Sequence, residues 1–211
     1  RDDNTILNDN PNIEYVFHGS EGADTISLYY SGYSSALSPV LSGSRLTGLE
    51  GIIAKSLEFT NVEVLEFLFG SGNDSLTVFD LAPGVQIKVL GGAGSNTLDL
   101  SSFPTTVDVQ LTGSGEHSGF NGQTSNNSVI FTNISILHGN DSGDLNNSLT
   151  GLNALAVFNL GDGITGSTPT GGQYIAGERT LTFTGFKALN GGSAADTFVI
   201  SGSAEFSLLN G

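Results

Sequence analysis

Several short segments of the chain alternate between apolar and polar side chains, and each alternation predicts a β-strand. Val85, Ile87 and Val89 are separated by single polar residues, so the three apolar side chains share one face. A period of two residues is the pattern of a strand that buries one face only. The same alternation recurs at 107–111 and 180–184.

No segment carries the long, capped apolar stripe that predicts an amphipathic helix. Residues 51–69 are the richest in helix formers, but Val62, Val64, Phe67 and Phe69 suit a strand at least as well. The predicted fold class is therefore all-β.

A three-residue signature recurs along the chain: Asp or Asn, then Ser or Thr, then an apolar residue. Its copies lie at 4–6, 24–26, 74–76, 96–98, 127–129, 147–149 and 196–198. Glycine-rich residues precede several copies. Neighbouring copies are often about 20 residues apart, the spacing of a strand-and-turn repeat.

A longer period also appears, because residues about 122 positions apart match each other. Matching pairs include Asn4 with Asn127, Asp24 with Asn147, Asp74 with Asp196, and His18 with His138. We therefore predict one continuous segment over 1–211, with about 1.7 copies of a ~122-residue repeat. Residues 1–123 form the first copy and 124–211 part of a second. Residues 209–211 resemble 189–191, as expected of an array that continues.

Coils of about 20 residues predict a parallel β-helix (β-solenoid), in which each coil stacks on the previous one. Asn, Ser and Thr at equivalent positions would then stack into hydrogen-bonded ladders at the turns. Two spacers, 29–48 and 113–126, are expected to protrude as loops. The alternative is a tandem array of Ig-like β-sandwiches, since ~122 residues also suits one such domain.

Composition and charge narrow the possible partners. The chain has 30 Gly, no Cys, and 21 acidic against 6 basic residues, which gives a formal net charge of −15. This charge disfavours nucleic acid and anionic membranes as partners. The absence of Cys excludes disulfides and thiolate chemistry. No apolar run reaches the ~18 residues that predict a membrane helix.

Two turns carry a resemblance to a known class of protein. Residues 69–77 read FGSGNDSLT and residues 90–98 read LGGAGSNTL. Both resemble the GGxGxD nonapeptide repeats of RTX-type proteins. The alternation of strands with such turns is similar to the β-helical repeat regions of giant secreted bacterial adhesins and surface proteins. The resemblance covers most of the chain through short motifs, and it implies an extracellular or cell-surface location.

The resemblance also implies Ca²⁺ as a cofactor at the turns, where carboxylate and carbonyl oxygens would surround the ion. The first candidate ligands are Asp24, Asp74 and Asp196, followed by Asp141 and Asp144 in a segment dense in oxygen donors. The motifs here are separated by whole coils, and Asn replaces Asp in several signatures. The alternative is that these residues form turns and ladders without a metal.

We predict that the segment is not an enzyme. None of the six basic residues lies beside an acidic motif in a pattern that suggests a site. His18 and His138 occupy matching positions before Gly, which indicates a role in turns. His117 lies in a Gly/Ser-rich segment.

The function that we predict is a structural or adhesive repeat module, acting as a rigid spacer or fibre segment of an extracellular bacterial surface protein. Its partners would be neighbouring copies of the repeat or like subunits, and a surface glycan is a further candidate. The alternative is a glycan- or partner-binding module that uses the protruding loops. A carbohydrate-active β-helix enzyme is a third reading.

Overall fold

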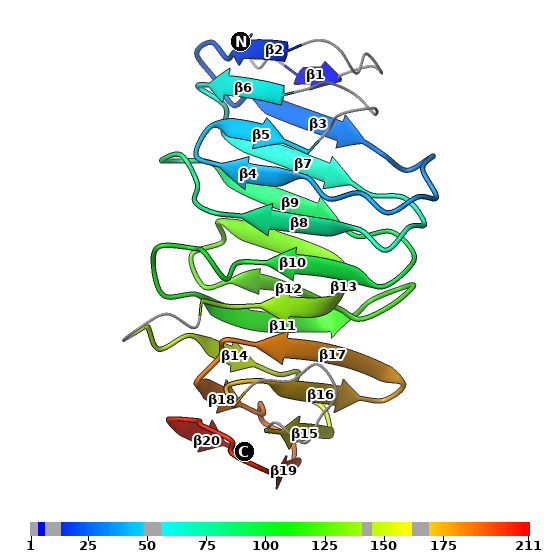
Figure 1. Ribbon diagram of the computed structural model, residues 1–211, viewed down its shortest axis with the longest axis vertical. Coiled ribbons are helices and arrows are strands. Elements are labelled where there is room, and N and C mark those ends of the chain that lie inside the picture. Colours follow the sequence, from blue (N-terminus) through cyan, green and yellow to red (C-terminus); the bar gives the residue numbers. More distant parts are fainter. Residues whose placement is uncertain (1–3, 7–13, 49–55, 141–144, 162–168) are drawn as a thin grey trace.

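The computed structural model describes residues 4–6, 14–48, 56–140, 145–161 and 169–211. Its regular structure in these ranges consists of β-strands, which confirms the predicted all-β class (Figure 1). Within the same ranges, no helix is long and apolar enough to cross a membrane.

The described residues form 20 strands. They are β1 (Asn4–Ile6), β2 (Glu14–His18), β3 (Thr25–Tyr29), β4 (Val40–Ser42), β5 (Arg45–Thr47), β6 (Ser56–Thr60), β7 (Val64–Leu68), β8 (Ser75–Val78), β9 (Gln86–Leu90), β10 (Asn96–Asp99), β11 (Asp108–Ser114), β12 (Phe120–Thr124), β13 (Val129–His138), β14 (Ser148–Thr150), β15 (Ala156–Leu160), β16 (Gly172–Ala176), β17 (Arg179–Thr184), β18 (Ala188–Asn190), β19 (Asp196–Ile200) and β20 (Leu208–Asn210).

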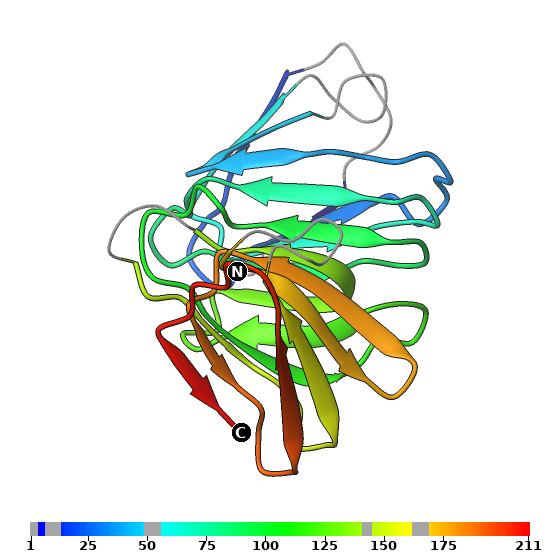
Figure 2. The same cartoon turned by 60° about the horizontal axis from the view of Figure 1, so that its bottom comes forward.

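The strands form two runs of hydrogen-bonded neighbours that share β13. The first run is β1–β3–β7–β9–β13–β12–β11–β14–β18–β20. The second run is β2–β6–β5–β4–β8–β10–β13–β17–β16–β15–β19. The strand direction turns gradually from the N-terminal to the C-terminal end (Figure 2), as the intrinsic twist of β-sheets requires.

Three antiparallel triplets interrupt an otherwise regular alternation of the chain between the two runs. They are β4–β5–β6, β11–β12–β13 and β15–β16–β17. In each triplet the first strand lies two positions further along the run than the third strand. The middle strand is antiparallel and fills the position between them. The third strand pairs with the strand of the same run that preceded the triplet, as β6 pairs with β2. The other pairings are parallel, for example β3 with β7 and β7 with β9.

The triplets explain the two spacings between paired residues. Asn4 pairs with Thr25 and Ser75 with Thr97, so partners are about 20 residues apart where no triplet intervenes. Thr25 pairs with Val64, about 40 residues away, because the β4–β5–β6 triplet lies between them. A triplet therefore adds two strands to the segment between paired residues.

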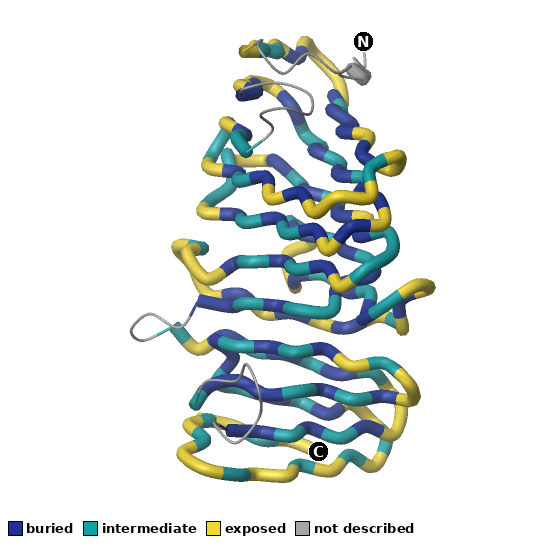
Figure 3. Tube along the Cα trace, turned by 45° about the vertical axis from the view of Figure 1, so that its right-hand side comes forward, coloured by how far each residue is buried: buried dark blue, intermediate teal, exposed yellow. Residues whose placement is uncertain are grey.

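Inward-facing side chains on neighbouring strands stack on each other and form one apolar core. In the first run one such row contains Leu28, Phe67, Val89 and Phe131, and in the second run another contains Leu76, Leu98, Leu137 and Phe183. These eight side chains are at most 1% exposed. Figure 3 shows the resulting alternation of buried and exposed positions along the strands. Each of these side chains contributes about 1.5–3 kcal/mol through burial, and the stacking contacts join neighbouring strands of each run.

Strand β13 passes from the first run to the second at Asn133. Residues 129–132 pair with β9, and residues 136–138 pair with β17. Asn133 has a φ of 55°, which lies in the left-handed region that Asn tolerates better than most residues. This single bend allows one long strand to serve both runs.

The two spacers that were expected to protrude are partly built into the sheet, so that prediction was wrong for much of their length. Residues 29–48 contain β4 and β5, and residues 113–126 contain β12. Leu41 and Leu46 are fully buried. The reason is that an antiparallel return pairs the backbone groups of the extra residues with neighbouring strands, which an unpaired loop leaves to solvent.

Candidate functional site

A ladder of buried polar side chains lies where the chain turns into β8, into β10 and into the second half of β13. The Leu37 N–H donates to Oδ1 of Asp74 at 2.9 Å, and the Asp74 N–H donates to Oδ1 of Asn96 at 3.0 Å. Nδ2 of Asn96 donates to the Asn133 carbonyl at 3.2 Å. The predicted ladder is thus present, although its links run from side chain to backbone.

The same arrangement recurs at Asn147, just before β14. The Val107 N–H donates to Oδ1 of Asn147 at 2.7 Å, and Nδ2 of Asn147 donates to the carbonyls of Asn140 and Gly185. Asn147 is fully buried. An Asn at this position satisfies one donor and two acceptors of the backbone, which is its chemical advantage over Asp.

Asp74 differs from Asn96 because a carboxylate has no N–H to donate. Asn96 donates to the carbonyls of Gly91 and Ala93, at 2.6 and 3.0 Å, whereas Oδ2 of Asp74 is buried and has no hydrogen-bond partner. Burial raises the pKa of the Asp74 carboxyl, and backbone N–H groups of Leu37 and Gly70 partly oppose this effect. The Asp74 carboxyl is therefore suited to hold a proton or a cation.

The other candidate calcium ligands lie in separate turns. Asp24 precedes β3, and its N–H donates to Oε2 of Glu63 at 2.7 Å. Asp196 begins β19 beside Ala156 of β15, and both of its carboxylate oxygens are buried without a hydrogen-bond partner. Across the described ranges, no three His, Cys, Asp or Glu side chains gather as a metal site.

Asp141 and Asp144 lie outside the described residues. The structure therefore places three of the five predicted ligands, and it brings none of these three together in one turn.

The matching histidines make the same contact in different coils. Nδ1 of His18 lies 2.7 Å from Oγ1 of Thr60, and Nδ1 of His138 lies 2.7 Å from Oγ1 of Thr184. Each pair joins two neighbouring parallel strands, β2 with β6 and β13 with β17. The predicted role in turns is thus wrong in its detail, because His18 and His138 are the last residues of β2 and β13 and each contacts a neighbouring strand.

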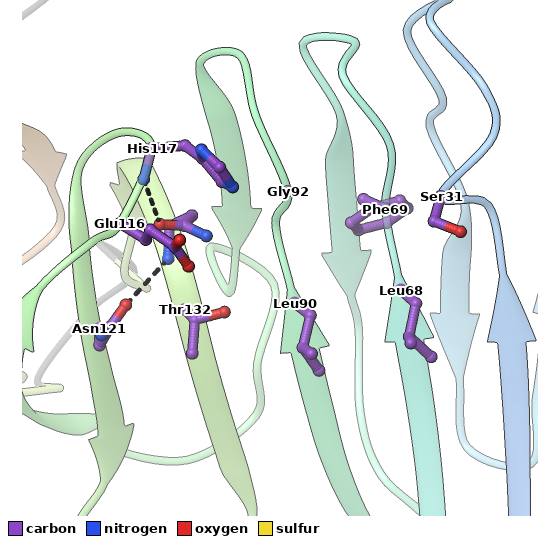
Figure 4. A pocket seen from close by; sticks show the side chains of 10 residues that line it. Ser31, Leu68, Phe69, Leu90, Gly92, Glu116, His117, Asn121 and Thr132 are labelled. Atoms are coloured by element: carbon purple, nitrogen blue, oxygen red, sulfur yellow. Dashed lines mark hydrogen bonds between the residues drawn. The ribbon is translucent and has the colours of Figure 1, made fainter.

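A groove on the outer face of the first run was not predicted from the sequence. Its volume is about 370 Å³. Leu68, Leu90 and Thr132 form its floor at the ends of neighbouring strands β7, β9 and β13. In Figure 4 Glu116 and His117 stand over the Thr132 end, and Ser31 lies at the opposite end. The sequence feature that could have indicated the groove is a leucine, Leu68 or Leu90, at an outward position of each of two strands with alternating polarity.

The turn that carries Glu116 and His117 is held by hydrogen bonds from several directions. The His117 N–H donates to Oδ1 of Asn133 at 3.1 Å, and Oγ of Ser118 donates to the Gly94 carbonyl at 2.5 Å. The Arg179 guanidinium donates to the carbonyls of Glu116 and His117 at 3.0 and 2.8 Å. The wall of the groove is therefore fixed to three other parts of the chain.

The Glu116 side chain is exposed. In the part of the chain that the structure describes, one ion pair is found, between Arg45 and Glu58 at 3.5 Å. The Glu116 carboxylate is therefore available to a cationic group from outside the molecule.

Comparison of the chain with models of protein families, with curated proteins and with solved structures finds no match.

Proposed function

We propose that this chain is a segment of a β-solenoid that acts as a rigid spacer or fibre segment of a secreted or cell-surface bacterial protein. The observation that carries the proposal is the parallel pairing of strands about 20 or 40 residues apart over one continuous apolar core. In such a stack every coil adds a fixed rise, and stability arises between neighbouring coils.

The longer repeat supports this proposal through equivalent strands. Six strands of the first copy have an equivalent strand later in the chain, in the same order and in the same run. The equivalent pairs are β2 and β13, β3 and β14, β6 and β17, β7 and β18, β8 and β19, and β9 and β20. The His18–Thr60 and His138–Thr184 contacts are equivalent and equally long. The β4–β5–β6 triplet corresponds in the same way to the β15–β16–β17 triplet.

The parallel pairings favour a solenoid over a tandem array of Ig-like sandwiches. An Ig-like domain is built from two antiparallel sheets, whereas here antiparallel pairing is confined to the three triplets. The proposal includes no catalytic role.

Calcium at the turns is a subsidiary proposal. Its support is the buried, unpartnered carboxylate oxygens of Asp74 and Asp196 in a protein of strongly negative charge. Such oxygens are the ligands that Ca²⁺ prefers.

The spacer function predicts how length grows with each added repeat. From β2 to its equivalent β13, the second run passes through β6, β5, β4, β8 and β10, which makes six strand separations. At ~4.8 Å per separation one repeat adds about 29 Å. The test inserts a second copy of residues 19–138 after His138 and compares the maximum dimension of both proteins by small-angle X-ray scattering.

We expect an increase of about 29 Å with an unchanged cross-section. A cross-section that grows, or a scattering curve typical of two bodies joined by a flexible linker, would show that the repeats do not stack into one rod. Retention of the far-ultraviolet circular dichroism per residue shows that the inserted copy has folded.

A further inference from the structure

The groove on the first run combines an apolar floor with one charged group. Leu90 is 38% exposed, and Leu68 beside it is partly exposed. Leu68 and Leu90 are direct neighbours in parallel register, and Thr132 follows Leu90 in the next strand. The row from Leu68 to Thr132 thus spans two strand separations, about 10 Å.

Oxygen acceptors gather at the Thr132 end of this row. Glu116, Asn121 and Thr132 all line this part of the groove (Figure 4). The Asn121 side chain is already engaged, because its Oδ1 accepts the Asn133 N–H at 3.1 Å and its Nδ2 donates to the Ser114 carbonyl. Glu116 is the one of these three acceptors that carries a negative charge.

The net charge of the whole molecule favours a positively charged ligand. With a net charge of −15, the protein attracts cations and repels anions over its surface. Arg179 is the nearest cation that the structure ties to this turn, and its guanidinium is used by the carbonyls of Glu116 and His117. It does not line the groove.

We infer that this groove binds a lysine side chain of a partner polypeptide. The aliphatic stem of the lysine lies across Leu90 and Leu68, and its ammonium group forms a charge-assisted hydrogen bond with the Glu116 carboxylate. A lysine has this combination of an apolar stem and a compact cationic end.

Arg179 is a positioning residue for this site. It holds the turn of Glu116 through two backbone carbonyls and does not line the groove.

A lysine-binding groove goes beyond the proposed spacer role, because a solenoid that only adds length has no need of a ligand.

The test is a titration followed by two-dimensional ¹H–¹⁵N NMR at low ionic strength. The probe is a blocked pentapeptide with a central lysine between glycines. One comparison peptide replaces lysine with norleucine, which keeps the stem without the charge, and a neutral trisaccharide, maltotriose, tests the sugar alternative. We expect saturable shifts at the amides of residues 89–91, 115–118 and 131–133 with the lysine peptide only.

Two variants and a matched control locate the site. Glu116→Gln is expected to weaken binding about fivefold, and Leu90→Thr, which copies the neighbouring Thr132, about threefold. Glu205→Gln removes the same charge from an exposed position on another coil and is expected to leave the affinity unchanged. Thermal unfolding of each variant checks that it is folded.

Equal binding of the norleucine peptide would overturn the ionic part of the inference and with it the choice of lysine. Binding of maltotriose in place of the peptide would assign the groove to a neutral sugar. Absence of saturable shifts with the lysine peptide, or full affinity in Glu116→Gln, would overturn the inference altogether.

Discussion

At the scale of single residues, the difference between Asp and Asn at one ladder position decides whether every buried polar atom has a partner. Asn96 and Asn147 each use their amide group to satisfy backbone carbonyls. Asp74 keeps the acceptor, which binds the Leu37 N–H, but leaves Oδ2 without a partner. The sequence indicated that these positions are equivalent, but it gave no measure of how deeply they are buried.

We predict that Asp74→Asn stabilises the protein in metal-free buffer at neutral pH. The amide removes a buried charge and adds a donor, with an expected gain of about 1 kcal/mol in the free energy of unfolding. For a chain of this length that gain raises Tm by about 2–4 °C. Differential scanning calorimetry in the presence of a chelator measures it.

The pH dependence of stability gives a second readout of the same change. Because burial raises the pKa of Asp74 in the folded state, the group contributes stability below its unfolded pKa. That contribution is lost as pH rises through the folded pKa. Asp74→Asn should therefore flatten the decline in stability between the unfolded and the folded pKa of Asp74. Asp108→Asn, at an exposed position, is the control, and an unchanged profile in Asp74→Asn would contradict the assignment.

Close packing around Gly91 supports a separate prediction. A Cβ at this position would lie 2.6 Å from the Asn133 carbonyl oxygen and 2.9 Å from Nδ2 of Asn96. Gly91→Ala is expected to lower the free energy of unfolding by about 1–3 kcal/mol, measured by urea denaturation. Gly32→Ala is the control, since nothing lies within 4 Å of its Cβ. Equal stability of the two variants would show that the ladder tolerates displacement.

At the scale of elements, the sequence predicted the strands with several alternating apolar residues, and it missed short strands such as β4 and β5 and strand β12, whose alternation is incomplete. The inward positions of β12 include Phe120, Gly122 and Thr124. A Cβ at Gly122 would collide with the ring of Phe131, its neighbour in the antiparallel pair. The Phe131 ring thus fills the place of a side chain, so β12 shows no apolar alternation.

The groove was beyond prediction for a related reason. Its floor combines residues from β7, β9 and β13, and its wall comes from the turn between β11 and β12. The direction of that turn depends on contacts with Asn133, Gly94 and Arg179. These contacts join positions far apart in the chain, and no local pattern specifies them.

The same contacts predict how the β11–β12 turn responds to loss of Arg179. In Arg179→Ala we expect hydrogen exchange at the Gly115 and His117 amides to become faster, while the strand amides of the core keep their protection. The change in overall stability should remain below about 1 kcal/mol, because these bonds are exposed. Arg45→Ala, which breaks the exposed pair with Glu58, should leave the turn unaffected. Unchanged exchange in Arg179→Ala would mean that the other bonds are sufficient to hold it.

At the scale of the whole molecule, core packing and net charge act against each other. One apolar core includes residues from both runs of strands, while the 21 acidic residues, against 6 basic ones, repel each other over the surface. Added salt shortens the range of that repulsion, with a Debye length that falls from about 30 Å at 0.01 M to about 8 Å at 0.15 M. Sodium chloride alone should therefore raise Tm.

Calcium must be separated from this general effect of salt by comparing CaCl₂ with NaCl at equal ionic strength. If Asp74 holds an extracellular-type site with a Kd of about 1 mM, then 5 mM Ca²⁺ adds about 1 kcal/mol of stability. We expect a corresponding rise in Tm of about 2–4 °C beyond that in NaCl. Asp74→Asn should lose this rise, so that its stability advantage over the unchanged chain disappears in Ca²⁺. Asp108→Asn should keep the full response. Equal Tm values in the two salts would leave Asp74 as a buried, proton-binding member of the ladder, and the carboxylate would then have a structural role alone.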